Sequence, residues 1–161
     1  MPNDRAHYDP QACGALCDQC ALQGQVPVPP EEHAAATFDF VGPYPGADEV
    51  HARRPWVGPA GMEAMRAFTA AGLRRADANW RNLLACAPAD GNLEAVKATA
   101  RAEGLMDPIA ACAPRLAREM AHTRQIVTAG AEAARQLIPG VTGGILDYRG
   151  NVVDVPGGLT P

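Results

Sequence analysis

Three short apolar runs, each followed by a turn and a helical pattern, constrain the fold of this chain more than any other feature. The runs cover residues 37–41, 79–85 and 125–129, and their aromatic, β-branched and aliphatic side chains are typical of buried strands. Strands that alternate with helices predict a parallel sheet covered on both faces. We therefore expect an α/β fold with three layers, α/β/α, and a central, mainly parallel sheet of roughly four strands.

Helical spacing and capping residues predict the elements between these runs. Met62, Met65 and Phe68 recur on one side of a helix, and Asp107 followed by Pro108 is typical of a helix start. The expected helices cover residues 59–71, 93–103, 108–120 and 131–137, and residues 143–157 suggest a hairpin.

Ligands of parallel α/β sheets bind beyond the carboxyl ends of the strands. The loop at Gly42, the segment after Ala85 and the turn at Gly130 each follow an expected strand. The sequence therefore places a binding site at this edge of the sheet.

Four cysteines form a second pattern, in which Cys17 and Cys20 make a Cys-x-x-Cys pair and Cys86 and Cys112 lie farther along. Thiolates are soft metal ligands, and one Cys-x-x-Cys turn can supply two of them. The set could hold zinc or a [4Fe–4S] cluster, and the spacing alone does not distinguish these. Cys13 with Cys17 is another feasible pair, and Cys86 and Cys112 could instead be small buried apolar residues.

The bulk composition describes a single globular domain over residues 1–161, with 1–36 as an irregular arm that carries cysteines. The chain has 161 residues, of which 47% are apolar and 20% charged. No run approaches the roughly 18 apolar residues of a membrane helix, and the first residues lack the apolar core of a signal peptide. We expect a cytoplasmic protein without membrane contact, in which free thiols persist.

The charge distribution bears on nucleic-acid binding. A formal net charge of −4 argues against a broadly basic binder. The basic residues that flank the expected loops are nevertheless predicted to form a local rim able to contact phosphates. They are Arg53, Arg54, Arg74, Arg75 and Arg81.

Five motifs follow one another along the chain. They are Cys17-Asp-Gln-Cys20-Ala-Leu22, Val41-Gly-Pro-Tyr-Pro-Gly46, Arg53-Arg-Pro-Trp-Val-Gly-Pro-Ala-Gly61, Arg81-Asn-Leu-Leu-Ala-Cys86 and Ala111-Cys-Ala-Pro-Arg-Leu116. In this order they resemble the motifs of the uracil-DNA glycosylase superfamily, and specifically its iron–sulfur branch, family 4. The resemblance implies hydrolysis of the N-glycosidic bond of a deaminated base flipped out of DNA. It also implies a [4Fe–4S] cluster on the four cysteines, with zinc as the alternative.

The resemblance assigns a base-binding role to five residues. Trp56 would stack on the extruded base, and Asn82 would recognise the edge of uracil because an amide both donates and accepts. Gly42, Pro43 and Tyr44 would shape the wall of the pocket. From the residues alone, Trp56 could instead be a core residue, Asn82 a turn former and Tyr44 a surface aromatic.

Three departures from the family pattern bear on catalysis. Pro43 stands where the family usually has a glutamate linked to the attacking water. Asp48 and Glu49 are the nearest carboxylates that could replace it, although a solvated turn is the alternative interpretation. The final His-Pro-Ser motif of the family would follow Pro161, where the sequence ends, and the interval between Cys86 and Cys112 is long enough for an extra helix.

Two functional hypotheses follow from these motifs and departures. The first is a uracil-DNA glycosylase whose partner is DNA containing uracil. The second is a catalytically inactive DNA- or uracil-binding module of a phage-type replication or repair system, with replication or repair proteins as further partners.

Overall fold

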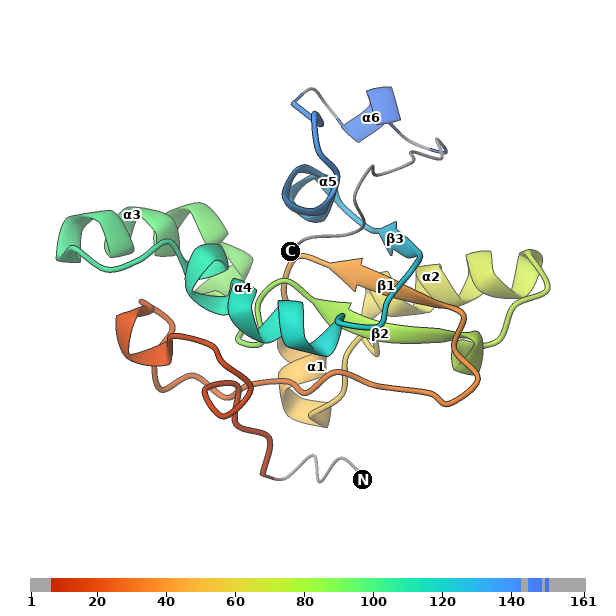
Figure 1. The fold of residues 1–161 in the computed structure, drawn as a ribbon, viewed down its shortest axis with the longest axis horizontal. Coiled ribbons are helices and arrows are strands. Elements are labelled where there is room, and N and C mark those ends of the chain that lie inside the picture. Colours follow the sequence, from red (N-terminus) through yellow and green to blue (C-terminus); the bar gives the residue numbers. More distant parts are fainter. Residues whose placement is uncertain (1–6, 143–144, 149, 151–161) are drawn as a thin grey trace.

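The computed structural model describes residues 7–142, 145–148 and 150, and it has the parallel α/β fold expected from the sequence (Figure 1). The strands are β1 (Phe38–Gly42), β2 (Ala78–Asn82) and β3 (Ile126–Thr128), in the spatial order β2-β1-β3. Both pairings are parallel. The sheet thus has three strands within the described residues, against the four expected.

β2 ends earlier than the sequence predicted. The register pairs Gly42 with Asn82, so these two residues close their strands side by side. The next two amides then bond to the loop after β1, because Leu83 N donates to Gly42 O (2.8 Å) and Leu84 N donates to Pro43 O (3.0 Å). The chain therefore leaves the sheet at Asn82 and follows the Gly42 loop.

Helices flank the sheet in close to the predicted places. They are α1 (Ala47–Ala52), α2 (Pro59–Ala70), α3 (Leu93–Glu103), α4 (Pro108–Glu119), α5 (Ala131–Leu137) and α6 (Ile145–Tyr148), together with the 3-10 turns η1 (Cys17–Gln19), η2 (Arg75–Asp77) and η3 (Ala89–Gly91). The four predicted helices are confirmed, whereas α1 and α6 were not predicted. Helix α6 contradicts the expected hairpin over 145–148, and the rest of that prediction, apart from residue 150, lies outside the described residues.

Local capping explains the limits of α3 and α4. The side chain of Asn92 accepts a hydrogen bond from Ala95 N (3.0 Å), and that of Asp107 accepts one from Ile109 N (2.9 Å). Each bond satisfies an amide that the first turn of a helix leaves without a partner. α3 ends at Gly104, whose φ of 69° is the left-handed conformation that glycine adopts at low cost.

The pleat of β1 separates two apolar cores. Phe40 packs on one face with Phe68 of α2 and with Trp80, whereas Val41 packs on the other face with residues of α4 and α5 such as Leu116. Figure 1 accordingly has α4 on the near side of the sheet and α2 on the far side. This is the expected three-layer arrangement.

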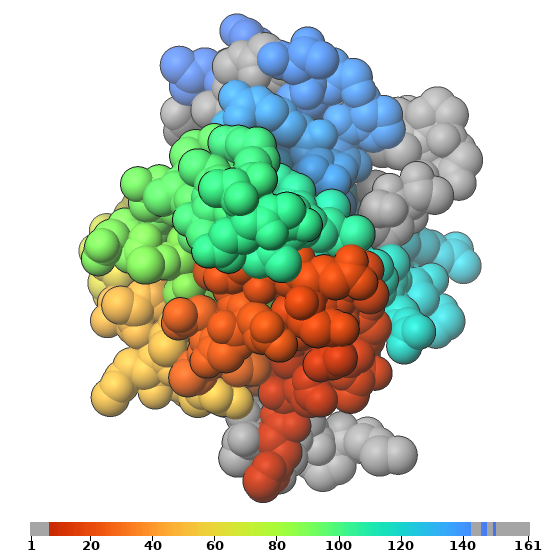
Figure 2. Space-filling model, turned by 90° about the vertical axis from the view of Figure 1, so that its left-hand side faces the viewer, coloured from red at the N-terminus to blue at the C-terminus, as the bar shows by residue number. Residues whose placement is uncertain are grey.

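The arm before β1 is held by backbone bonds rather than by long elements of its own. Leu16 N donates to Ala111 O in α4 (2.8 Å), and Val28 N donates to Ala85 O (2.7 Å). Glu31 forms an antiparallel bridge with Trp80 at the edge of β2. Figure 2 shows the arm as one continuous surface with the α3–α4 region. Within the described residues, no helix has the length and apolar character needed to cross a membrane.

Candidate functional site

Three of the predicted base-binding residues meet at the carboxyl edge of the sheet. A Cβ atom at Gly42 would lie 2.8 Å from Cη2 of Trp56 and 3.0 Å from Oδ1 of Asn82. Glycine is therefore required at position 42, because any side chain would displace the indole or the amide. Asn82 is buried, and no hydrogen bond of its side-chain amide is found in the part of the chain that the structure describes.

Trp56 lies at the margin of the aromatic core. Its ring contacts Phe40 edge-on, with centroids 4.7 Å apart, and its Nε1 donates to Arg81 O (3.0 Å). The side chain is half-buried, so the indole is neither a wholly interior residue nor a free surface one. Its φ of 59° is unfavourable for a residue with a bulky side chain, which means that surrounding contacts must hold it.

The first of these contacts comes from Glu49. Its buried carboxylate accepts hydrogen bonds from Val57 N (2.9 Å) and Gly58 N (2.7 Å), directly after Trp56, and from Gly46 N (3.0 Å). Asp48 and Glu49 both lie in α1, so the interpretation of these residues as a solvated turn is wrong. Asp48 is exposed, whereas both oxygens of Glu49 are engaged in holding the backbone around Trp56.

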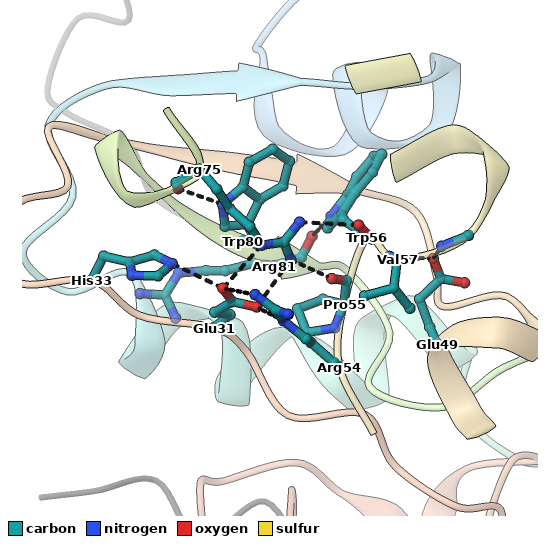
Figure 3. A network of polar contacts seen from close by, with 11 residues as sticks. Glu31, His33, Glu49, Arg54, Pro55, Trp56, Val57, Arg75, Trp80 and Arg81 are labelled. Atoms are coloured by element: carbon teal, nitrogen blue, oxygen red, sulfur yellow. Dashed lines mark hydrogen bonds and ion pairs between the residues drawn. The ribbon is translucent and has the colours of Figure 1, made fainter. Parts of the chain in front are cut away.

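The second contact comes from Glu31, at the centre of a polar network (Figure 3). Arg54 donates to its carboxylate at 2.6 and 2.9 Å, and Arg75 donates at 2.9 and 3.0 Å. His33 Nε2 lies 2.9 Å from the same carboxylate. Burial alone would raise the pKa of Glu31, but the hydrogen bonds from the two guanidinium groups hold the pKa well below its usual 4.5.

Arg75 carries this network to the backbone of the Trp56 loop. It donates to Pro55 O (2.7 Å) and to Trp56 O (3.1 Å), and its guanidinium lies 4.6 Å from the ring centroid of Trp80. Glu31, Arg75 and Glu49 together therefore fix the loop that carries the strained tryptophan.

The predicted basic rim is formed only in part. Arg54 and Arg75 bind Glu31, and Arg81 is buried with Nε 2.8 Å from Asp39, so these three guanidinium groups neutralise internal carboxylates. A charge in or near the core is stable only when it is paired. Arg74 pairs with Asp77 across 2.8 Å, but its side chain is exposed on the surface.

Pro43 and Tyr44 line the same edge but are fixed by neighbouring segments. Pro43 packs near Gly130, where a Cβ atom would lie 3.8 Å from its ring. Tyr44 is half-buried, and its hydroxyl donates to Gly91 O in η3 (2.7 Å). Pro43 places no ionisable group at the position of the family glutamate.

The four cysteines of the predicted metal site converge. Cys17, Cys20, Cys86 and Cys112 all line one cavity of about 320 Å³ between the arm, the segment after β2 and α4. Cys13 is not among the residues that line it. Over residues 7–142, 145–148 and 150, no three His, Cys, Asp or Glu side chains are placed to hold a single metal ion.

The protonation of these thiols reflects their crowding. The pKa of Cys86 is raised to about 12, chiefly by burial and in addition by the neighbouring sulfurs of Cys112, Cys17 and Cys20. The pKa values of Cys17 and Cys20 are raised by burial first and by Cys112 next. Four thiolates that line one cavity would repel one another, so the deprotonated set requires a positively charged partner.

The sequence indicated the residues expected to bind the base, but not the residues that support the loop around Trp56. Glu31 and Arg75 were not singled out as a pair, because their partners are distant in the sequence. A local signal did exist for Glu49, since a glutamate three residues after the N-cap can accept a hydrogen bond from the N-cap amide, as Glu49 does from Gly46 N at the start of α1.

Comparison with known proteins agrees with this geometry. The family model described as the uracil DNA glycosylase superfamily matches residues 29–156. The chain belongs to the uracil DNA glycosylase superfamily. This match confirms the resemblance noted in the sequence, and it spans β1, the Trp56 loop, β2 and α4.

One curated relative narrows the similarity. The chain is 31% identical over 126 residues to the type-4 uracil-DNA glycosylase of Pyrobaculum aerophilum. The alignment covers 76% of this chain and 59% of the relative, so the chain spans about three-fifths of the protein that it matches.

Replacing Glu31 by glutamine tests whether this carboxylate stabilises the loop. We expect Glu31→Gln to lower the free energy of unfolding at pH 7 by about 3 kcal/mol, because two guanidinium groups lose their shared partner. A carboxylate whose pKa is depressed in the folded state stabilises fully above its unfolded value of 4.5 and loses that contribution as the pH falls through the folded value. The difference between wild type and variant should therefore narrow from pH 7 to pH 3 in urea denaturation followed by tryptophan fluorescence.

Glu63→Gln is the matched control, since Glu63 forms an exposed pair with Arg66. It should change the free energy of unfolding by less than about 1 kcal/mol. A Glu31→Gln variant as stable as this control, or a difference from wild type that does not narrow with pH, would contradict the role of Glu31.

Proposed function

We propose that this protein is a uracil-DNA glycosylase of the type-4 kind, which hydrolyses the N-glycosidic bond of uracil flipped out of DNA. One observation supports this most strongly: the side-chain amide of Asn82 and the indole of Trp56 meet over Gly42 at the carboxyl edge of the sheet. Parallel α/β folds bind their ligands at this edge. Membership in the superfamily supplies the reaction class.

Binding of the extruded base would rest on two side chains. Stacking of a base on an aromatic ring is worth roughly 1–3 kcal/mol, which offsets part of the cost of unstacking it from DNA. Asn82 can donate to uracil O4 and accept from N3–H, a combination that cytosine does not match. Negative charge develops on the departing uracil, and preorganised hydrogen bonds such as that of Asn82 would stabilise it.

The attacking water lacks an evident general base. Pro43 cannot ionise, and the carboxylate of Glu49 is occupied by three backbone amides. Catalysis would then depend on positioning and on leaving-group stabilisation, and we expect it to be slow.

The cysteine cavity supports a further part of the proposal. We infer that Cys17, Cys20, Cys86 and Cys112 hold a [4Fe–4S] cluster. The four cysteines that line one cavity supply soft thiolate donors, the ligand set that holds such clusters in proteins, and zinc on the same thiolates is the alternative. Its role would be structural, joining the arm to α4 without redox turnover.

DNA containing uracil is the proposed partner, and the cytoplasm the proposed location, because unpaired cysteines persist there. Replication or repair proteins are further partners that the proposal allows.

A second function is favoured by two observations: Pro43 cannot ionise, and the Glu49 carboxylate is bonded to backbone amides. A catalytically inactive module would bind uracil-containing DNA through the same residues without cleaving the bond.

Release of uracil from a single-uracil oligonucleotide is the experiment that tests the leading proposal. The anaerobically purified protein should release the base slowly, and the strand should break after alkali. Asn82→Ala should reduce the single-turnover rate by about 100-fold, since one stabilising hydrogen bond to the developing charge is lost. Gln136→Ala, which removes an exposed amide on α5, is the control and should match wild type. Tight binding without any base release would instead identify the inactive module.

Pro43→Glu separates a competent pocket from an inactive one. If the pocket is otherwise complete, a carboxylate at position 43 should increase the rate of base release by about 100-fold, within the usual range for a positioned general base. The same rate in Pro43→Glu and wild type would show that position 43 does not limit catalysis.

Paired serine variants test the metal site. Cys112→Ser should lose the brown colour together with its iron and acid-labile sulfide, because it removes a ligand. Cys13→Ser should keep all three, because Cys13 does not line the cavity. A colourless wild-type protein that contains zinc would refute the cluster. Loss of iron from Cys13→Ser, with iron retained in Cys112→Ser, would refute the proposed set of ligands.

A further inference from the structure

A buried guanidinium joins the cysteine-bearing helix to the end of β2. Arg115 lies in α4, three residues after Cys112, and its side chain is almost completely buried. Its Nη2 donates to Asn82 O (2.8 Å) and to Leu83 O (2.7 Å). The backbone of the residue expected to recognise the base is therefore bonded directly to α4.

The guanidinium is itself held in place from the other side. Arg115 Nη1 donates to Glu119 Oε2 (2.7 Å), and Tyr8 donates its hydroxyl hydrogen to Glu119 Oε1 (2.7 Å). Arg81, next to Asn82 in the chain, lies 3.6 Å from the same Glu119 carboxylate. The arm, α4 and β2 are thus connected through one ionic cluster.

The segment that follows Asn82 has bonds on both of its sides. Arg115 binds the carbonyls of Asn82 and Leu83, while Leu83 N and Leu84 N donate to Gly42 O and Pro43 O. These bonds replace the strand pairing that ends at Asn82. Removal of the guanidinium would leave two buried carbonyls without this donor on the α4 side.

An arginine suits this position better than other cations do. Its planar fork binds two adjacent carbonyls and a carboxylate at fixed angles, whereas a lysine is a single point charge on a flexible stem. The bonds therefore fix an orientation as well as a distance.

We propose that Arg115 is a positioning residue that sets the backbone of Asn82 according to the position of the cysteine-bearing α4. The expected effect of Arg115 on catalysis rests on the proposed function, whereas its hold on the backbone at Asn82 and Leu83 does not. Loss of Arg115 should slow base release without loss of the metal centre.

The test uses a double variant that keeps the buried charges balanced. Arg115→Met with Glu119→Gln removes the cation and its carboxylate together, which avoids leaving one buried charge alone. Arg115→Lys is the conservative variant. Arg118→Gln, on the exposed side of the same helix, is the control.

Four measurements are made on each iron-containing protein: iron per chain, affinity for uracil-containing DNA, hydrogen exchange of the Leu83 and Leu84 amides, and single-turnover release of uracil at saturating DNA. In the double variant, iron content and DNA affinity should match wild type, and the Leu83 and Leu84 amides should exchange faster. The rate of uracil release should fall by about 100-fold, which is the effect expected from a small misplacement of a positioned group. Arg115→Lys should recover part of the rate, and Arg118→Gln should behave as wild type.

The outcomes separate this inference from the proposed function. Unchanged exchange in the double variant would overturn the inference, and so would an unchanged rate of release or a loss of iron that accounts for the whole loss of rate. If wild-type protein releases no uracil, the proposed function fails, and the exchange of Leu83 and Leu84 alone then decides whether Arg115 holds the backbone.

Discussion

Two buried carboxylates hold the loop on which the candidate site depends. Trp56 adopts a left-handed backbone conformation that its side chain disfavours, and Glu49 and Glu31 fix the peptide groups on both sides of it. Glu49 binds amides directly, whereas Glu31 acts through Arg75. Because the indole then lies over Gly42, the geometry of the proposed base site depends on two carboxylates that lie outside it.

A second set of constraints reaches the same edge from the opposite face of the sheet. The arm and α4 contribute the thiols of one cavity, and Arg115 of α4 bonds to the carbonyl of Asn82. A metal centre in that cavity would therefore support the site mechanically, although it lies apart from the proposed chemistry. Through Arg115, a cofactor bound there would influence the placement of the Asn82 backbone.

Local patterns were sufficient to predict the parallel α/β fold, and the family match agrees with the motif order. Apolar spacing located α2 and α4, and the four cysteines grouped from the sequence, at 17, 20, 86 and 112, all line one cavity. The early end of β2 was not predictable, because it depends on bonds from Leu83 to the Gly42 loop. Arg54, Arg75 and Arg81 were expected to face phosphates, but their carboxylate partners are distant in sequence and leave no local signal.

The most direct measurement is a crystal structure of the protein with uracil-containing DNA or with free uracil. We predict electron density for the uracil base against the indole of Trp56, with uracil O4 and N3 within hydrogen-bonding distance of the Asn82 amide. Density for the base elsewhere, or an indole displaced from Gly42 so that the base and the amide do not meet, would contradict it.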